Sequence, residues 1–378
     1  MKYEFKHIHP NQEIWTQIEA STQSTCFHTK EWYAYLKKIG YHPYMISVST
    51  DNTLVGYFIG ERIWRGVWLL TSPFEGIGTY TQGLVLLGKN ENGELRTENG
   101  DMRTKTREEE RVEIYRQLAE WAFANHVAVY LQVDDWQLRR DSAEWIPYEV
   151  FKQDVLERLQ VKYEFRPTLY LDMGGKTEEE LWSMQHYKSC KYSVNKARKL
   201  GLYVRQITEK EEIAAFCKRH YAQLHEVCVR KGMTPKPSQA EARMRALCEA
   251  LFPYRVIMME CIGKDENGEE VVMSTGIFCP DKGESIYWTG ASYQRYQKCC
   301  PNELMVWEAI RLLQQRGAGG LNFGGMADYK LKFGTIYAYV PRLIFTKYQW
   351  IYQAKTAAKQ TYHGIRNGLA KWVKKRKK

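Results

Sequence analysis

The sequence has none of the short motifs that mark most metal, nucleotide and hydrolase sites. Its nine cysteines are scattered, and no CxxC pair, HExxH helix, GxSxG turn or GxxxxGK[ST] loop occurs. This pattern argues against a disulfide framework and against a zinc ribbon. The neighbouring Cys299 and Cys300 have no set of metal ligands around them. We therefore expect reduced thiols and no metal site.

Long apolar runs are also missing. No segment approaches the ~20 residues of a membrane-spanning helix, and the first residues lack the apolar centre of a signal peptide. At 378 residues, with 44% hydrophobic and 13% aromatic content, the chain is long enough for two or three domains with sizeable cores. These features predict a folded, cytoplasmic protein.

Acidic residues are absent from the C-terminal tail. Residues 347–378 contain ten Lys or Arg and no Asp or Glu, so they carry +10 of the net charge of +11. Drawn as a helix, residues 351–373 place apolar side chains on one face and basic ones at its rim, which is typical of membrane-surface helices. A helix packed on the protein body and an RNA-binding tail are the alternatives. The residues expected to contact an anionic membrane at its inner face are Trp350, Trp372, Lys374, Lys375 and Arg376.

Two stretches of the remaining chain have the same order of predicted elements. Each has helices, then antiparallel strands joined by tight turns, then a helix and a closing strand. The closing strands are expected at residues 127–133 and 321–325. This repetition predicts an α+β fold of two tandem domains. We place the domains at residues 1–165 and 166–346, and the basic helical tail at 347–378.

Residues 177–201 are predicted to form a helix between the two domains. Thr177 and Glu180 have the spacing of a capping box, and Gly201 marks the end of the helix. Basic residues cluster on its downstream half, where four of them could bind phosphate or RNA. A solvated helix face is the alternative. These cations are Lys188, Lys191, Arg198 and Lys199.

Two lysines occupy an unexpected place near the end of the second domain. Lys330 and Lys332 lie in DYKLKF, between the Gly-Gly turn of LNFGG and an apolar run at residues 336–345. Long cations are rarely fully buried unless they are paired. Alternation along an exposed edge strand, where lysine protects against aggregation, is one explanation. A charge held where a reaction needs it is the other.

Three motifs, in this order, resemble the FemABX-like branch of the GNAT-fold acyltransferases. SVNKARKLGL, at 193–202, is similar to the entry of that family's second domain. PNELMVWEAIRLLQQRGAGGLNFGG, at 301–325, is similar to its helix and following strand, and YKLKFG, at 329–334, fits its [FY]-K-x-x-F-G motif. HTKEWYAYLKK is a weaker match, with His28 where glutamine is usual. The chain also resembles related acetyltransferase domains of bacterial surface-polysaccharide loci. The resemblance implies two GNAT-like domains and acyl transfer onto an amine.

The resemblance assigns a catalytic role to Lys330, with Tyr329 as the adjacent aromatic side chain. When an amine attacks a carbonyl carbon, negative charge develops on the oxygen, and a donor aimed at it contributes ~3–4 kcal/mol in oxyanion holes. Lys332 is the alternative lysine. Arg230 in VRKG and Tyr287 in IYWTGAS match positions that bind substrate in the family. No carboxylate stands out as the general base.

The glycine-containing loop that cradles the pyrophosphate of acyl-CoA is lacking. The equivalent residues, 294–305, contain no glycine, and Pro301 contributes no N–H. We therefore expect no bound cofactor and favour aminoacyl-tRNA over acyl-CoA as co-substrate, with a peptidoglycan precursor as acceptor. An acyl-CoA-dependent N-acyltransferase acting on an amino sugar of a surface polysaccharide is the alternative. A non-catalytic RNA- or membrane-binding protein of this fold is a third interpretation.

Overall fold

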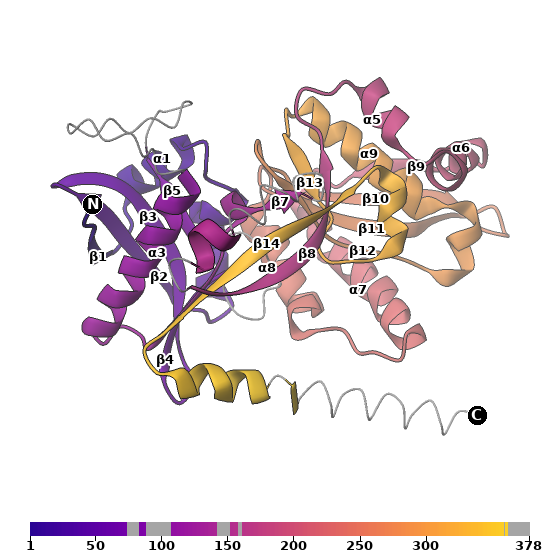
Figure 1. The fold of residues 1–378 in the computed structure, drawn as a ribbon. Helices are drawn as coiled ribbons and strands as arrows, with labels where there is room; N and C mark the ends of the chain where they lie inside the picture. The colour runs from indigo at the N-terminus through magenta and orange to yellow at the C-terminus, as the bar shows by residue number, and fades with distance from the viewer. Residues whose placement is uncertain (74–82, 88–106, 142–151, 158–160, 359, 362–378) are drawn as a thin grey trace.

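One mixed sheet runs through the whole molecule (Figure 1). The computed structural model describes residues 1–73, 83–87, 107–141, 152–157, 161–358, 360 and 361. The 14 strands follow the order β1-β2-β3-β4-β6-β14-β8-β13-β12-β11-β10-β9, with β5 beside β3 and β7 beside β14. Within the described part of the chain, no helix is both long and apolar enough to cross a membrane.

The N-terminal half is an antiparallel meander followed by a helix and a parallel strand. Asp51 and Asn52, with φ of 48° and 60°, form the two-residue turn between β2 and β3, a conformation that this type of hairpin requires. After α3, strand β6 pairs in parallel with β4. The elements are β1 (Glu4–Ile8), α1 (Gln12–Ala20), α2 (Lys30–Lys38), β2 (Pro43–Thr50), β3 (Thr53–Trp64), β4 (Trp68–Ser72), β5 (Gly83–Leu86), α3 (Arg107–Ala124), β6 (Tyr130–Asp134) and β7 (Arg140–Asp141).

The C-terminal half repeats this plan. Strands β10, β11 and β12 form a meander, α9 crosses over, and β13 pairs in parallel with β12 through Ser285 and Ile286 alone. Beyond Ile286 the two strands part. The elements are β8 (Lys162–Asp172), α5 (Glu178–Met184), α6 (Tyr192–Lys199), β9 (Tyr203–Gln206), α7 (Ile213–Arg230), α8 (Glu241–Leu251), β10 (Ile257–Lys264), β11 (Glu270–Cys279), β12 (Ser285–Ser292), α9 (Pro301–Gln315), β13 (Gly320–Asn322) and β14 (Ile336–Thr346).

The last strand joins the two halves. β14 pairs with β8 over most of its length and with β6 through its final residues. At this junction Arg342 donates to both carboxylate oxygens of buried Asp134, at 2.6 and 2.7 Å, and Arg166 pairs with the same carboxylate. The domain boundary expected after residue 165 falls inside β8, so the sheet continues from one half to the other without a break.

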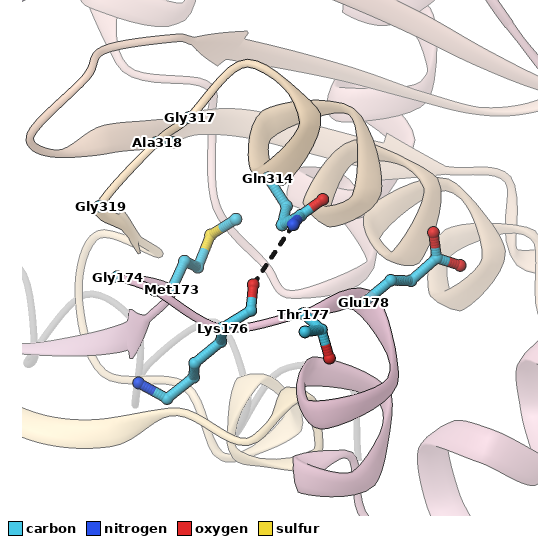
Figure 2. Close-up of a pocket in the computed structure, with 10 residues that line it drawn as sticks. Met173, Gly174, Lys176, Thr177, Glu178, Gln314, Gly317, Ala318 and Gly319 are labelled. Atoms are coloured by element: carbon cyan, nitrogen blue, oxygen red, sulfur yellow. Dashed lines mark hydrogen bonds between the residues drawn. The ribbon is translucent and has the colours of Figure 1, made fainter.

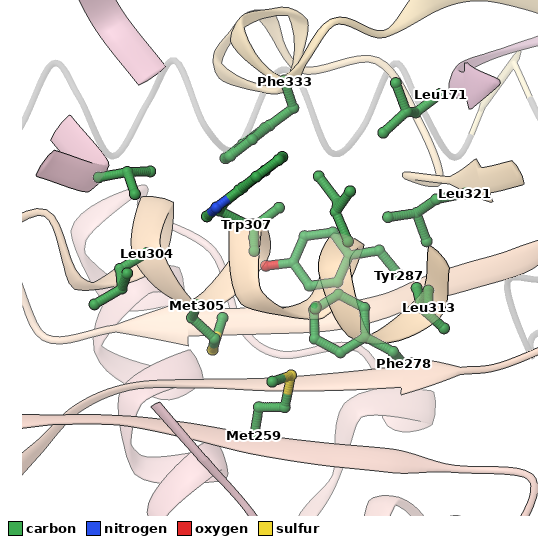
Figure 3. Packing of buried hydrophobic residues seen from close by; sticks show 14 of the residues in the cluster. Leu171, Met259, Phe278, Tyr287, Leu304, Met305, Trp307, Leu313, Leu321 and Phe333 are labelled. Atoms are coloured by element: carbon green, nitrogen blue, oxygen red, sulfur yellow. The ribbon is translucent and has the colours of Figure 1, made fainter. Parts of the chain in front are cut away.

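A large apolar core lies between α9 and the sheet of the C-terminal half (Figure 3). Tyr287 and Phe333 belong to this core, so the segment with the two lysines is anchored in it by Phe333. Fully burying such a side chain stabilises the fold by about 1.5–3 kcal/mol. The other large members of the core include Leu171, Met259, Phe278, Leu304, Met305, Trp307, Leu313 and Leu321.

The predicted helix at 177–201 is divided into three pieces. The capping box of Thr177 and Glu180 is present and begins α5, but α5 ends at Met184. A short π-helical turn, η5 (Tyr187–Lys191), and then α6 complete the segment. The single-helix prediction was therefore wrong. The interruption has a structural cause. The side-chain amide of Gln185 donates to the backbone oxygen of Phe333, and the backbone N–H of His186 donates to that of Lys332, so neither group continues the helix.

The tail begins as a helix that packs on the body. Residues 349–358 are helical, and Ile351 is buried in a cluster with Leu69, Tyr130 and Ile344. Lys355 donates to Gln132 at 3.2 Å. Trp350 is exposed. Trp372, Lys374, Lys375 and Arg376 lie outside the described residues.

Candidate active site

The segment with the two lysines is a 3₁₀ helix, η9 (Asp328–Phe333), between β13 and β14. The edge-strand explanation for Lys330 and Lys332 is therefore wrong. A 3₁₀ helix completes a turn in three residues, so side chains two residues apart point in different directions. Each lysine accordingly has its own partners.

The position of η9 is fixed by the linking segment. The backbone oxygen of Phe333 accepts from Gln185 Nε2 at 3.0 Å, and that of Lys332 accepts from His186 N at 2.9 Å. Gly334 ends the helix with φ of 76°, and a Cβ there would lie 2.9 Å from Met184. Because a left-handed, crowded position admits only glycine without strain, the final residue of YKLKFG is part of how the segment is held.

Lys330 is buried, with 9% of its surface exposed. Its Nζ donates to the backbone oxygen of Phe323 at 2.6 Å and to that of Gly324. Burial, and to a lesser extent the charge of Lys231, lower the pKa of Lys330 to about 8. The group is therefore protonated for the most part at neutral pH. An ammonium has three N–H groups, so one remains for a further acceptor.

The two carbonyls that hold Lys330 are themselves fixed by a buried polar network. Asn322 Oδ1 accepts from Thr168 Oγ1 at 2.6 Å and from Gly324 N at 2.8 Å. Asn322 Nδ2 donates to Glu284 Oε1 at 2.8 Å. Asn322 and Thr168 are fully buried. These hydrogen bonds hold the turn after β13 in place. Because the carbonyls of this turn bind the Lys330 ammonium, its position is fixed as well.

Lys332 pairs with Glu303, which lies in the first turn of α9. Both side chains are largely buried. Pro301 occupies the first position of this helix and Cys300 precedes it in a left-handed conformation. The N-terminus of α9, where an anion would be favoured, therefore already has a carboxylate. No spacing in the sequence signals this pair, which joins residues 29 positions apart.

The charge of the same carboxylate acts on two tyrosines. Desolvation and the charge of Glu303 raise the pKa of Tyr329 to about 12. Tyr287 is buried between Phe278 and Phe323, and burial, with smaller contributions from Tyr329 and Glu303, raises its pKa well above the usual value. The Tyr287 hydroxyl has no hydrogen-bond partner among the described residues. Its oxygen lies against Gly290, where any Cβ would overlap it. An unpartnered buried hydroxyl is a group that a bound substrate can satisfy.

The C-terminal end of α7 lies near the group formed by Lys330, Tyr329 and Tyr287. Lys231 lies close enough to Lys330 to lower its pKa. Arg230, beside it, reaches Gln297 of the 3₁₀ segment η8 (Gln294–Cys299). With the amide oxygen of Gln297 facing Arg230, the two guanidinium nitrogens lie 3.1 and 3.2 Å away. The structure thus brings Tyr287, Tyr329, Lys330 and the Arg230 end of α7 together. Sequence reasoning missed Lys231 and Glu303, although Lys231 stands inside the VRKG motif.

The cations of the linking segment do not join this group through any described contact. Lys191 donates to the backbone oxygen of Ser183 at 3.1 Å, and Arg198 pairs with Glu308 at 2.8 Å. Lys188 and Lys199 are exposed. His28, the weak match of the N-terminal helix, is buried, and its Nδ1 accepts from Thr25 N at 3.0 Å. It caps a turn before α2.

A separate hollow of about 460 Å³ lies at the other end of α9 (Figure 2). It is lined by residues 173–178, Gln314 and residues 317–319, and Gln314 Nε2 donates to Lys176 O across it at 3.2 Å. None of the site residues predicted from the sequence lines it. In the part of the chain that the structure describes, no group of three His, Cys, Asp or Glu side chains is placed to hold a metal ion.

Part of the chain matches a known protein family. Residues 184–332 match the model of the Acetyltransferase (GNAT) domain, and this range contains Tyr287, Glu303, Tyr329 and Lys330. No curated protein matches the sequence.

Solved structures show the same fold over nearly the whole chain. FemX is similar over 93% of this chain and 99% of its own, with a TM-score of 0.65 and 14% identity. A conserved protein of unknown function from Bacteroides thetaiotaomicron is similar over 90% of this chain and 100% of its own, with a TM-score of 0.50 and 12% identity. At these identities the likeness concerns the fold, and it confirms the predicted α+β architecture of GNAT type.

Proposed function

We propose that the chain is a FemABX-like acyltransferase of the GNAT fold, and that it moves an aminoacyl group from aminoacyl-tRNA to an amine of a peptidoglycan precursor. In this reaction the amine nitrogen attacks the ester carbonyl carbon and forms the new N–C bond. The C–O bond to the ribose then breaks, and the ribose oxygen takes up the proton that the amine loses. We assign the group around Lys330 to this step.

The observation that carries the proposal is the ammonium of Lys330. Two backbone carbonyls hold it in a dry position, and its remaining N–H is free for the carbonyl oxygen of the substrate. A preorganised donor of this kind acts on the charge that develops in the transition state. With a pKa of about 8, the group is still charged when it is needed. Tyr329 stands beside it, and its ring centre lies 5.9 Å from Nζ.

The N-terminus of α9 supports a donor other than acyl-CoA. A pyrophosphate is cradled by free N–H groups at a helix start, whereas this start has Pro301 without an N–H and the carboxylate of Glu303 close by. That carboxylate, paired with Lys332, already occupies the position at the helix start that an anion would take. The ester of an aminoacyl-tRNA needs no such cradle. An acyl-CoA donor and an amino-sugar acceptor form the second candidate, which the match to an acetyltransferase model favours.

The remaining residues have proposed roles in binding. Arg230 and Lys231 would meet a phosphate of either substrate, and Tyr287 would donate its free hydroxyl to the acceptor. Exposed Lys188 and Lys199 are the cations of the linking segment that remain open to an RNA phosphate. The basic tail would hold the protein at the cytoplasmic face of an anionic membrane, where lipid-linked precursors lie.

A transfer assay with the full-length chain tests the donor. The protein is incubated with a muramyl-pentapeptide precursor and either a radiolabelled aminoacyl-tRNA pool or a panel of labelled acyl-CoAs. Transfer from charged tRNA, sensitive to salt because RNA phosphates dominate such binding, would support the proposal. Transfer from an acyl-CoA alone would overturn it and point to the second candidate.

Thermal unfolding provides an independent measurement of binding. A ligand at about 100 times its dissociation constant stabilises the fold by ~2.7 kcal/mol. Charged tRNA should therefore raise the melting temperature more than the same tRNA after deacylation. The variant Lys330→Met, which keeps the rest of the site, is the control for transfer. Equal shifts with both tRNAs would indicate RNA binding without recognition of the ester.

A further inference from the structure

We propose that the tip of the β3–β4 hairpin and the first turns of the C-terminal helix form one docking face for an anionic lipid bilayer. The inference extends the membrane contact proposed for the tail to a second element of the fold, and it does not depend on the transfer reaction. It is carried by the positions of exposed tryptophans, by the cluster that joins the two elements, and by their charge.

The exposed tryptophans gather at this one place. Among the residues that the structure describes, the exposed tryptophans are Trp64 (57%), Trp68 (37%) and Trp350 (59%). Tyr348 is also exposed. Single exposed apolar side chains are normal, but a contiguous group indicates an interaction site. Trp and Tyr are the residues that favour the boundary between lipid and water.

The hairpin tip and the helix are parts of one packed unit. Ile63 and Val67, which flank the turn of the hairpin, pack in the same cluster as Ile351 and Tyr352 of the helix. Figure 1 shows this helix beside the end of β4. The backbone also connects them, since Val129 N donates to Trp68 O and Lys347 N donates to Val129 O, each at 2.9 Å. Trp64 and Trp350 therefore belong to two elements that pack on the same hydrophobic cluster.

The hairpin side chains are held in place although they are exposed. The guanidinium of Arg62 lies 3.8 Å from the centre of the Trp68 ring, and its Nε donates to Val127 O at 2.7 Å. The rings of Trp64 and Trp68 meet edge to face at 5.2 Å. Such ordering reduces the entropy lost when the rings are buried in a partner.

The charge of the face complements an anionic surface. Residues 62–68 include Arg62 and Arg65, residues 347–361 include three lysines, and neither segment has an Asp or Glu. In the sequence, residues 362–378 add seven further Lys or Arg and no acidic residue. Each such cation near an anionic leaflet is worth roughly 1 kcal/mol. Tryptophans at the tip of a hairpin, surrounded by cations, match a headgroup layer better than the groove that RNA binding requires.

Vesicle co-sedimentation of the full-length chain tests the proposal. The lipids are phosphatidylcholine alone or with 30 mol% phosphatidylglycerol, a mixture of about one anionic lipid in three that resembles an anionic leaflet. The test variant is Trp64→Ala with Trp350→Ala. The matched control is Tyr187→Ala with Tyr254→Ala, two exposed aromatics elsewhere on the surface. We expect the test variant to bind anionic vesicles roughly tenfold more weakly than wild type, since each aromatic ring buries 150–250 Å², and the control to bind like wild type.

A third variant separates this inference from the role of the tail. It replaces Lys374, Lys375 and Arg376 with glutamine and leaves the hairpin intact. If that variant loses binding while Trp64→Ala with Trp350→Ala binds like wild type, the tail acts alone and the shared face is wrong. If wild type binds no anionic vesicles, or binds single-stranded RNA in their place, both membrane proposals are wrong. Melting temperatures within about 1 °C of wild type, a shift of under about 1 kcal/mol for a chain of this length, show that the variants are folded.

Discussion

Lys332 forms an ion pair with Glu303, and this contact gives the two lysines of η9 different partners and different expected roles. The pair neutralises Lys332 and places a carboxylate at the start of α9. Lys330, two residues earlier, has backbone carbonyls and no carboxylate among the hydrogen-bond partners of its ammonium in the described part of the chain. Removing the Lys330 charge should therefore affect chemistry, whereas removing that of Lys332 should affect mainly the stability of the site.

The variant Lys330→Met should lose transfer activity with little change in substrate binding. Methionine keeps the length of the side chain but has no N–H for the developing oxyanion. Loss of one such donor lowers kcat by about 10²–10³-fold. Steady-state kinetics with separate kcat and KM measure this effect.

Lys332→Met is the matched control for that variant. It leaves Glu303 without its cation in a largely buried place, so we expect a loss of about 1–3 kcal/mol in the free energy of unfolding. Its kcat should fall far less than that of Lys330→Met. Equal losses of kcat in the two variants would contradict the assignment of the oxyanion contact to Lys330.

The rate should fall as the pH rises through about 8. Burial lowers the pKa of Lys330 to about 8, so the ammonium is present below that pH and is lost above it. The acceptor amine must itself be unprotonated, which makes the rate rise with pH at the acidic side. A pH profile of kcat should therefore show a maximum.

Lys330→Arg identifies the alkaline limb of this profile. A guanidinium stays protonated throughout the accessible range, so any activity that the variant retains should not decline near pH 8. An unchanged alkaline limb in Lys330→Arg would assign that limb to another group.

The titration of Lys330 should also affect the free energy of unfolding. Stability should rise with pH in the range where the rate falls. An unfolded Lys330 has its ordinary pKa near 10.4, so between pH 8 and 10 the unfolded state binds more protons than the folded state. Stability therefore rises with pH in this window. Relative to Lys330→Met, wild type should gain up to about 3 kcal/mol from pH 7 to 10.5. Denaturant unfolding of both proteins at several pH values measures it, and parallel curves would show that the charge is not desolvated.

Local chemistry made parts of this structure predictable from the sequence. The turn at Asp51 and Asn52 and the capping box of Thr177 and Glu180 depend only on neighbouring residues, and both were evident as patterns. YKLKFG was recognised as a motif, but its lysines, two positions apart, have the period of a strand as well. The 3₁₀ helix is decided by Gln185, His186 and the turn before it, which no local pattern shows.

Pairings between residues far apart in the chain could not be predicted from the sequence. Nothing in the run 336–345 indicates that β14 would join β6, some 200 residues earlier, because strand pairing over such a distance leaves no local pattern in the sequence. The pair of Glu303 and Lys332 is hidden for the same reason. The motifs therefore point to the residue types of the candidate site, but not to the contacts that give those residues their charge states.

The network of Asn322 should determine how well Lys330 is positioned. Asn322→Leu removes the partner of the buried Thr168 hydroxyl and of the partly buried Gly324 amide. We expect a loss of about 2–4 kcal/mol in unfolding free energy together with a fall in kcat. Thr168→Val, which removes one hydroxyl from the network, should cost about 1 kcal/mol and leave kcat near that of wild type. A fully active Asn322→Leu would show that the turn holds its shape without the network.

Asp134 should couple the two halves of the sheet. Asp134→Asn keeps the shape of the side chain but leaves Arg342 without a carboxylate at the junction of β6 and β14. Breaking a buried ion pair costs about 3–5 kcal/mol. Arg342 keeps 19% side-chain exposure, so we expect about 2–4 kcal/mol in denaturant unfolding. Glu249→Gln, which breaks the more exposed pair with Lys38, is the control and should cost less than about 1 kcal/mol. Equal costs for the two variants would mean that the junction is held by strand pairing and packing, and that the carboxylate adds nothing to it.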